Sequence, residues 1–368
     1  MHLKSIAYFM HVHWNWIKQR PHFLYEELAK KNFVDLYYVR KFHEKSLSDN
    51  HELLKIPFSS TSGSLLWLEK KINRRKINLN KNYDVVWITS PVMMQFIPEK
   101  FLEDKLIIYD CMDDYLEFDV NKKDIRRNYL REANLVKIAD NVLTSSGYLK
   151  EKIMSRYADY LQKEPICVNN GISSEFIPNN LTETDCLNLS YHESGIFNLT
   201  YIGTIGEWFD KDLILEIINN FDKVVVTLVG PIQIDIFDHP RLVKMGQVHH
   251  RELPEIAKKA DAFIMPFILN ELVLSVDPVK IYEYISFNKP IISVRYDEIL
   301  RFEQFLFTYS NRNELLNIIG YLINGGKKNY SLEDAILFLK NSTWETRVEQ
   351  ISSKVWIDLE VSEGEKNK

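Results

Sequence analysis

The sequence has few cysteines, no long apolar run and no excess of positive charge. Its three cysteines among 368 residues, Cys111, Cys167 and Cys186, are scattered, so their spacing predicts neither a disulfide framework nor a Cys-x-x-Cys metal site. No apolar run reaches the roughly 18 residues of a membrane span. The N-terminal MHLKSIAYFM lacks the apolar core and cleavage site of a signal peptide. These absences favour a reducing cytoplasm.

The charge is negative overall and uneven along the chain. A net charge of −5 argues against general nucleic-acid binding. Residues 1–190 carry 27 basic and 25 acidic side chains, whereas the remaining residues carry 19 and 26. The two halves therefore differ in character, and the length suggests two domains.

Apolar, β-branched runs alternate with longer amphipathic stretches, which indicates parallel sheets covered by helices on both faces. A polar stretch without apolar periodicity, 178–195, interrupts the pattern and is typical of a linker. Ligands of such sheets bind beyond the carboxyl ends of the strands. The predicted strands before the linker are 5–10, 34–39, 83–90, 105–110, 141–146 and 166–170, and those after it are 197–203, 223–230, 262–267, 290–294 and 305–309.

The stretch DPVKIYEYISFNKPIISV, which starts at Asp277, is typical of a helix followed by a buried strand. Asp277 is a good N-cap and Pro278 suits the first helical position, so Lys280 lies in the first turn. A cation there opposes the helix dipole by roughly 0.3–1 kcal/mol unless an anion binds beside it. On this argument, removal of Lys280 relieves the empty protein. Glu283, on the same face, can accept hydrogen bonds from a diol, so the pair predicts a site for a ribose and its diphosphate. The alternative is a Lys280–Glu283 ion pair on a solvated helix.

This stretch resembles the nucleotide-sugar motif of GT-B glycosyltransferases, in the large retaining group called family 4. HWNWIKQRPHFLYEELAKK near the N-terminus and YDCMDD at 109–114 are similar more specifically to the teichuronic-acid type, whose members build bacterial surface polysaccharides. MGQVHHRELPEIAKKADAFIMPF at 245–267 is similar to the stretch that passes the nucleotide base. The resemblance runs from the first strand to NSTWETRVEQI near the end, and it depends on the order and spacing of these motifs.

The resemblance implies a donor-binding set in the second half of the chain. Glu283 corresponds to the ribose-binding glutamate, and Lys280 is similar to the basic residue near the diphosphate. The implied contacts of the diphosphate turn are Gly203, Thr204 and Ile205, and those of the base are Val248 and His249.

Two departures from the family pattern change the expected contacts. Family members often have two glutamates with seven residues between them, but here Ser275 precedes Glu283 by eight positions, so Glu271 is the candidate contact of the donor sugar. The turn GTIGEWFDKD has no arginine and only Lys211. We therefore expect the negative charge of the diphosphate to be neutralised by Lys280, by helix N-termini and by Arg20 of the opposite domain.

The loop after the first strand, HVHWNWIKQRPH, gathers residues that are unusual in an ordinary loop. We expect Trp14 and Trp16 to stack on a sugar, Arg20 to contact phosphate or acceptor, and His22 to be a catalytic candidate. The alternative is that Pro21 starts a helix and the aromatic side chains pack beneath it. The histidines of this loop alternate like metal ligands, but no partner ligands follow at metal-site spacing, so we expect no metal.

Three carboxylates lie close together at the end of a buried strand in YDCMDDYLEF. Asp110, Asp113 and Asp114 should repel one another, so at least one pKa should rise. That suits a general base or a ligand of an acceptor hydroxyl, with Asp110 and Asp113 as the catalytic candidates. The alternative is helix capping by Asp113 or Asp114.

The stretch SLLWLEKKINRRKINLNKN at 64–82 has six basic residues against one acid, together with Trp67 and several leucines. It can lie on an anionic membrane surface, where a lipid-linked acceptor would be found. The alternative is an ordinary solvated amphipathic helix.

These features predict an α/β protein of GT-B architecture, with two facing Rossmann-like domains and an interdomain cleft. We expect an acceptor domain at 1–180, to which a helix at about 344–368 crosses back, and a nucleotide-sugar donor domain at 196–343. The resemblance implies transfer of a hexose-type sugar, with retention, to a saccharide or lipid-linked acceptor, at the cytoplasmic face of the membrane and without metal or another cofactor. Two alternatives remain: a nucleotide-sugar epimerase on the same fold, and a catalytically silent nucleotide-sugar-binding subunit of a transferase complex.

Overall fold

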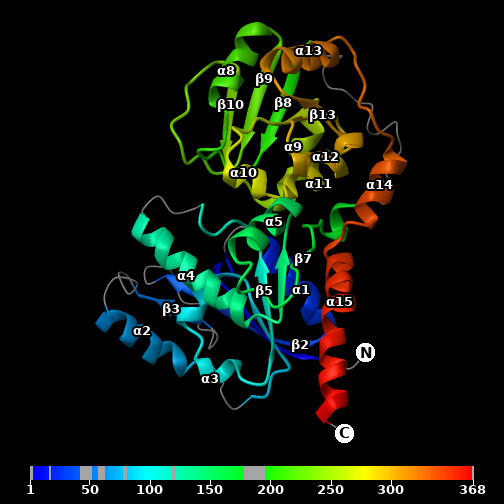
Figure 1. Cartoon of the computed structure of the whole chain (residues 1–368). Helices are drawn as coiled ribbons and strands as arrows, with labels where there is room; N and C mark the ends of the chain where they lie inside the picture. Colours follow the sequence, from blue (N-terminus) through cyan, green and yellow to red (C-terminus); the bar gives the residue numbers. More distant parts are fainter. Residues whose placement is uncertain are drawn as a thin grey trace. The chain divides into compact units, whose positions relative to one another are not determined.

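The computed structural model describes residues 3–15, 18–41, 52–56, 63–77, 81–117, 122–177 and 195–366. Contacts divide the chain into two compact units (Figure 1). Unit 1 comprises Met1–Asn170 and Trp344–Lys368, and unit 2 comprises Gly171–Thr343. The predicted linker 178–195 lies outside the described residues except for Gly195.

Unit 1 has a parallel sheet whose strands, in the described residues, follow the order β3-β2-β1-β4-β5-β6-β7. The order reverses its direction between β1 and β4, which is the topological switch point of a doubly wound sheet. The strands are β1 (Ser5–Met10), β2 (Phe33–Lys41), β3 (Glu52–Lys55), β4 (Val85–Ile88), β5 (Leu106–Cys111), β6 (Asn141–Thr144) and β7 (Ile166–Cys167).

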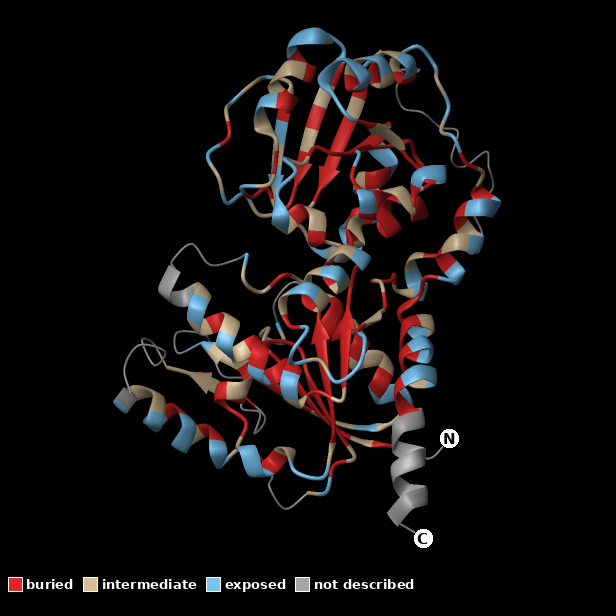
Figure 2. Cartoon of the chain, in the orientation of Figure 1, coloured by how far each residue is buried: buried red, intermediate tan, exposed pale blue. Residues whose placement is uncertain are grey.

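Successive residues of β1 enter different hydrophobic cores on the two faces of this sheet. Ile6 and Tyr8 belong to one core and Ala7 and Phe9 to the other, and all four are inaccessible to solvent. Figure 2 shows the central strands as continuously buried. This burial explains why the strands are apolar along their whole length instead of alternating.

Helices cover both faces of the unit 1 sheet. The last helix, α15, lies along α1, where the rings of Phe23 and Trp344 stack with their centroids 5.0 Å apart. The helical elements of unit 1 are α1 (Arg20–Lys31), α2 (Gly63–Arg74), the 3₁₀ helix η1 (Pro91–Gln95), α3 (Glu99–Leu102), α4 (Lys122–Ile138), α5 (Gly147–Arg156) and α15 (Trp344–Lys366).

Unit 2 repeats the same architecture with the strand order β10-β9-β8-β11-β12-β13 in its described residues, and its switch point lies between β8 and β11. The strands are β8 (Phe197–Ile202), β9 (Val224–Val229), β10 (Leu242–Gly246), β11 (Ala262–Met265), β12 (Ile291–Val294) and β13 (Phe307–Tyr309). The α-helices are α8 (Lys211–Asn220), α9 (Leu253–Lys259), α10 (Glu271–Ser275), α11 (Val279–Ser286), α12 (Asp297–Leu300), α13 (Arg312–Ile323) and α14 (Leu332–Lys340). The 3₁₀ helices are η2 (Ser174–Phe176), η3 (His250–Glu252) and η4 (Glu303–Phe305).

The structure confirms the predicted α/β class and every strand predicted from sequence, and it adds two. The additional strands, β3 and β10, each lie at one edge of a sheet. In β10 the exposed residues alternate with more buried ones, because only one face of this edge strand is well covered. Neither segment has the long apolar run that identifies the central strands.

Candidate functional site

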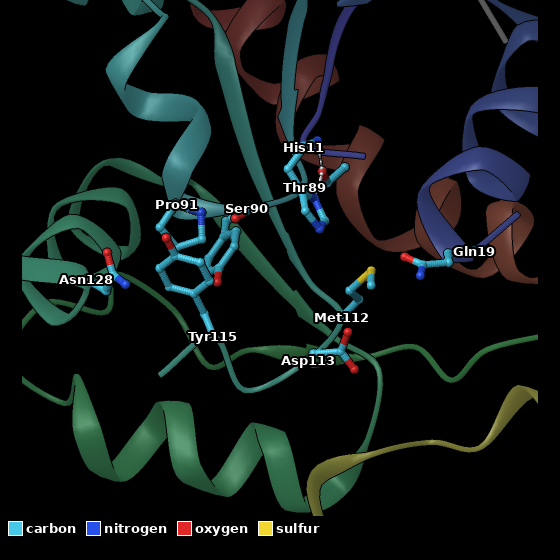
Figure 3. A pocket seen from close by; sticks show the side chains of 10 residues that line it. His11, Gln19, Thr89, Ser90, Pro91, Met112, Asp113, Tyr115 and Asn128 are labelled. Atoms are coloured by element: carbon cyan, nitrogen blue, oxygen red, sulfur yellow. Dashed lines mark hydrogen bonds between the residues drawn. The ribbon is translucent and has the colours of Figure 1, made fainter. Parts of the chain in front are cut away.

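Unit 1 has a cavity of about 350 Å³ at the carboxyl ends of β1, β4 and β5 (Figure 3). This place lies beside the switch point, where doubly wound sheets bind their ligands. The polar lining side chains are His11, Gln19, Thr89, Ser90, Asp113 and Asn128. The remaining lining residues are Pro91, Tyr109, Met112 and Tyr115.

Asp113 brings a titratable carboxyl group to this cavity. Its side chain is half-buried in the loop after β5. Burial raises the pKa of Asp113 to about 6, the positive charge of Arg20 opposes the rise, and the negative charge of Asp114 adds to it. The carboxyl group is therefore mostly ionised at neutral pH and can still take up a proton close to it, as a general base must.

His11 lines the same cavity as a neutral imidazole. Burial lowers its pKa to about 4, and neighbouring His22 adds to this effect. The backbone N–H of His11 donates to Thr89 Oγ1 over 3.2 Å, and His11 Nδ1 lies 2.8 Å from the same oxygen. These contacts tie the ends of β1 and β4 together, and Figure 3 shows the ring and the hydroxyl meeting.

The structure corrects the expected roles of Arg20 and Asp110. Both are buried, with 2% and 1% of their surface exposed, and Arg20 Nε donates to Asp110 Oδ1 over 2.9 Å. Arg20 Nη1 also donates to the carbonyl of Val168 over 2.7 Å and to Asn170 Oδ1 over 3.2 Å. A buried ion pair of this kind holds the strand ends of unit 1 together, because neither charge can be left alone out of water. We therefore retain neither residue as a contact of substrate.

His22 is likewise a structural residue instead of the expected catalytic one. It is fully buried, and burial lowers its pKa. Its Nδ1 accepts from the backbone N–H of Gln19 over 3.3 Å at the start of α1, so its Nε2 donates to the carbonyl of His13, also over 3.3 Å. With both ring nitrogens engaged, His22 fixes the loop against the helix.

The tryptophan predictions for the same loop have different outcomes. The Trp14 ring packs against the rings of His22 and Tyr25, with centroids 5.6 and 5.5 Å away. The structure thus places Trp14 beside the helix that Pro21 helps to start, which is the packing alternative. Trp16 lies outside the described residues.

Asp114 differs from Asp113 although they are adjacent in sequence. Its two oxygens each lie 2.8 Å from one terminal nitrogen of Arg156, and Lys152 Nζ is 2.9 Å from Oδ2. Burial raises the pKa of Asp114, but these cations outweigh burial and lower it overall. Asp114 therefore anchors α5, and Asp113 is the member of the acidic cluster that lines the cavity.

In unit 2, Lys280 and Glu283 form an ion pair at the start of α11. Lys280 Nζ lies 3.1 and 2.9 Å from the two carboxylate oxygens. The Lys280 side chain is 33% exposed and that of Glu283 is 8% exposed. Lys280 lies in the first turn as predicted, but Asp277 is not the N-cap, because Pro278 takes that position and Asp277 pairs with Arg301 instead.

The structure places α11 beside the turn that follows β8. The hydroxyl of Tyr284 accepts from the N–H of Ile202 over 2.7 Å and donates to its carbonyl over 3.2 Å. Ile202 is the last residue of β8, directly before Gly203 and Thr204. The sequence-predicted diphosphate turn and the Lys280–Glu283 helix are therefore neighbours.

The other predicted donor contacts lie in segments that follow strands of unit 2: Val248 and His249 in the loop after β10, and Glu271 in α10 after β11. Val248 is half-buried against the core, and His249 is exposed, with its backbone N–H donating to Glu252 Oε2 over 2.8 Å. Glu271 is an exposed residue at the start of α10, which Asn270 caps.

Within the described residues, no three His, Cys, Asp or Glu side chains are grouped so that they could hold a metal ion. The same part of the chain has no helix with the length and apolar character needed to span a membrane.

No protein-family model matches the chain. A curated relative, TuaH of Bacillus subtilis (strain 168), is provisionally named a teichuronic acid biosynthesis glycosyltransferase. It is 24% identical over 199 residues, which is 50% of this chain and 49% of the relative. The match thus spans about half the length of the relative, and it confirms the resemblance to the teichuronic-acid type.

Solved structures match over nearly the whole chain. HepE of Anabaena, in complex with UDP-glucose, has a TM-score of 0.65 and 14% identity, covering 95% of this chain and 99% of HepE. Sucrose-phosphate synthase of Thermosynechococcus elongatus has a TM-score of 0.68 and 12% identity, covering 98% of this chain and 100% of that chain. The chain has the GT-B fold, as the sequence predicted.

Proposed function

We propose that this chain is a glycosyltransferase that moves a sugar from a nucleotide-diphosphate donor to a saccharide or lipid-linked acceptor in bacterial surface polysaccharide synthesis. The observation that carries the proposal is the Lys280–Glu283 pair at the start of α11, next to the turn at Gly203. The similarity to TuaH and the UDP-glucose bound to HepE, which shares the fold, support the same conclusion.

Each of the proposed donor residues contacts a different part of the nucleotide sugar. Lys280 and the N-terminus of α11 offer positive charge to the diphosphate, and the backbone of Gly203 and Thr204 approaches it from the neighbouring turn. Glu283 accepts from the ribose hydroxyls, Val248 and His249 contact the base, and Glu271 contacts the donor sugar. This division leaves Lys280 as the charge that stabilises the departing diphosphate.

The acceptor binds in the cavity of unit 1, where the Asp113 carboxylate accepts from the hydroxyl that attacks. Transfer retains the anomeric configuration by a front-face mechanism, in which the leaving diphosphate helps to take the proton. Fixed cations and helix dipoles perform the role that a metal ion has in other transferases. Retention and metal independence follow from the family resemblance.

The cavity favours a transferase over the two alternatives. An epimerase acts on one nucleotide sugar and needs no second ligand site, whereas unit 1 has a cavity with its own titratable carboxyl group. A silent subunit that only binds the nucleotide sugar does not need an acceptor cavity in unit 1. Product analysis with acceptor present distinguishes all three.

The donor site is tested with a thermal-shift panel of nucleoside diphosphates and their sugars, followed by calorimetry on Glu283→Gln. A ligand at about 100 times its Kd adds roughly 2.7 kcal/mol, so the correct base gives a clear shift. Loss of the charged acceptor should weaken donor binding by about 1.5–3 kcal/mol. The control is Glu255→Gln on α9, which removes a similar but exposed partner of Lys258. Equal affinity of both folded variants and wild type would remove Glu283 from the site.

We also propose that unit 1 binds an anionic membrane surface, inside the cell, through α2. The side of α2 that packs against β3 and the residue after it carries polar side chains. Asn73 Oδ1 accepts from the N–H of Leu54 over 2.7 Å, and Glu69 Oε2 accepts from the N–H of Ile56, also over 2.7 Å. The side of α2 that is exposed instead carries Trp67, Leu68, Lys70, Lys71 and Arg74, with Arg75 following. Cations beside an interfacial tryptophan are what a negatively charged bilayer attracts.

Sedimentation with vesicles containing anionic lipid tests this proposal. Replacing Lys70 and Lys71 by Gln should reduce binding by roughly 2 kcal/mol, because each cation near such a surface contributes about 1 kcal/mol. Replacing the exposed Lys258 and Lys259 of α9 by Gln is the matched control and should change little. Wild-type protein that stays in the supernatant at low salt refutes the membrane proposal and leaves the transferase proposal standing.

A further inference from the structure

The cavity of unit 1 has hydrogen-bonding groups but no lysine or arginine among its described lining residues. Thr89, Ser90 and Asn128 are neutral hydrogen-bonding residues, and Tyr115 provides an aromatic ring. His11 adds no charge at neutral pH, since burial lowers its pKa to about 4. The volume of about 350 Å³ is near the lower end of ligand pockets, which suits a small polar ligand such as a sugar unit.

Among the described residues, the cations beside the aspartate cluster hold Asp110 and Asp114 and not Asp113. Asp110 is neutralised by Arg20, with Arg20 Nη2 2.9 Å from Oδ1. Asp114 is neutralised by Arg156 and Lys152. Asp113 is the carboxyl group of this cluster that lines the cavity, and no ion pair to it is recorded among the described residues.

Two neighbouring charges act on Asp113 in opposite directions. The positive charge of Arg20 lowers the pKa of Asp113, while the negative charge of Asp114 raises the pKa of Asp113. Each of the three nearby cations already has an aspartate within 2.9 Å, and Lys152 and Arg156 also face Glu117 and Glu132, so anions of unit 1 already match these charges. An anionic ligand would therefore meet a negative charge in a partly buried place, where screening by water is weak.

Building on the proposed function, we infer that the acceptor unit received by this cavity is an uncharged sugar, and that Asp113 excludes sugars that carry a carboxylate or phosphate there. The hydroxyls of a neutral hexose can donate to the carboxylate and exchange hydrogen bonds with the neutral side chains of the lining. A uronic acid of the same shape brings a second negative charge to the same place. The residue therefore selects by charge as well as by hydrogen bonding.

The experiment compares isosteric sugars that differ only at C6. The methyl glycosides of glucose, galactose and mannose are titrated against the full-length protein at pH 7.5, each beside the methyl glycoside of its uronic acid, with protein NMR as the readout. We expect at least one neutral glycoside to bind and its uronate to bind at least tenfold more weakly. The Asp113→Asn variant should reduce that ratio to near one, and its nucleotide-induced melting shift serves as the check that it is folded.

A pH series on the wild-type protein and on Asp113→Asn tests the same charge effect in a second way. Asp113, with its pKa of about 6, becomes protonated as the pH falls from 7.5 to 5, whereas a uronate remains ionised and His11, with its pKa near 4, remains mostly neutral. The ratio between hexoside and uronate binding should therefore fall over this range, and it should stay level in Asp113→Asn.

Three results would overturn the inference. The first is a uronate that binds wild type as tightly as its hexoside, and the second is a ratio that is unchanged in folded Asp113→Asn. The third is the absence of binding by any glycoside to a protein that nucleoside diphosphates stabilise, which leaves the proposed function standing. Failure of every nucleotide to bind refutes the proposed function instead, and the glycoside titrations then decide the inference alone.

Discussion

Replacing Lys280 by Ala tests the donor site and the energetics of α11 together. The dipole argument from the sequence predicts that the empty variant is at least as stable as wild type. The structure predicts the opposite sign, because Lys280 Nζ contacts both oxygens of Glu283, a carboxylate whose side chain is only 8% exposed. Removing the cation leaves that charge in a poorly hydrated place.

The magnitude follows from two opposing contributions. Loss of a hydrogen bond to a charged group costs about 1.5–3 kcal/mol. Relief of the cation from the positive end of the helix returns roughly 0.3–1 kcal/mol. The net expectation is a loss of about 1–2 kcal/mol from the free energy of unfolding. For a unit of this size, each kcal/mol lowers the melting temperature by about 2–4 °C, so we expect a decrease of roughly 2–8 °C.

The matched control is Lys258→Ala, on α9 of the same unit. Lys258 and Glu255 form an ion pair with the same i,i+3 spacing at 2.6 Å, but their side chains are 70% and 72% exposed. Exposed pairs contribute about 0–1 kcal/mol, so this variant should melt close to wild type. The difference between the two variants isolates the effect of burial at Glu283.

Each protein is melted empty and with saturating nucleoside diphosphate. The ligand-induced rise should be smaller in Lys280→Ala than in wild type or Lys258→Ala, because the proposed donor site has Lys280, and not Lys258, in charge-assisted contact with the diphosphate. An empty Lys280→Ala that melts at or above wild type refutes the ion-pair argument. Equal ligand-induced shifts in all three proteins refute the diphosphate contact.

Three further predictions concern stability. Gly230→Ala should lose about 1–3 kcal/mol from backbone strain at a φ of +140°, and more because a Cβ would overlap the carbonyl oxygen of Gly203. Gly246→Ala, at a φ of +70° with open space around it, has backbone strain without the overlap, so it is the control and should lose less; chemical denaturation measures both. Arg20→Met should lose about 3–5 kcal/mol, because it leaves a buried carboxylate unpaired, and an unchanged urea midpoint would contradict this. Asp113→Asn should be more stable than wild type at pH 7.5 by up to about 3 kcal/mol, since a carboxyl pKa raised from 3.8 to about 6 makes ionisation unfavourable to folding. This advantage should shrink as the pH falls from 6 toward 4, and a constant difference across that range would show that charge is not its cause.

The central strands of both sheets could be predicted from sequence because they are buried on both faces. Such strands are mostly apolar along their length, as in LIIY of β5 or VVVTLV of β9. The edge strand β3, ELLK, has only two apolar residues. Polar side chains of α2 accept hydrogen bonds from backbone N–H groups in and directly after this strand. Nothing in a four-residue segment of this kind distinguishes it from a turn.

The candidate site was only partly predictable, because residue type does not tell which partner a side chain takes. Arg20 and His22 have the chemistry of ligand contacts, and only the fold brings Asp110 and the loop backbone to them. The sequence pattern places Thr89 and Ser90 at the end of the strand predicted at 83–90, whereas β4 ends at Ile88. Their position at the carboxyl end of β4, next to the switch point, is the signal that could have identified them.

The polar inner side of α2 also determines how the unit 1 sheet ends. A strand at the edge of a sheet offers unpaired backbone groups to any extended segment that approaches. Here the amide of Asn73 both accepts from the N–H and donates to the carbonyl of Leu54, as a neighbouring strand would, while Glu69 takes the N–H of Ile56. Within the described residues, side chains of a helix thus occupy the positions that a further strand would take. Unit 1 is thereby protected at this edge from strand addition by a second copy, so a partial loss of α2 would expose a template for aggregation.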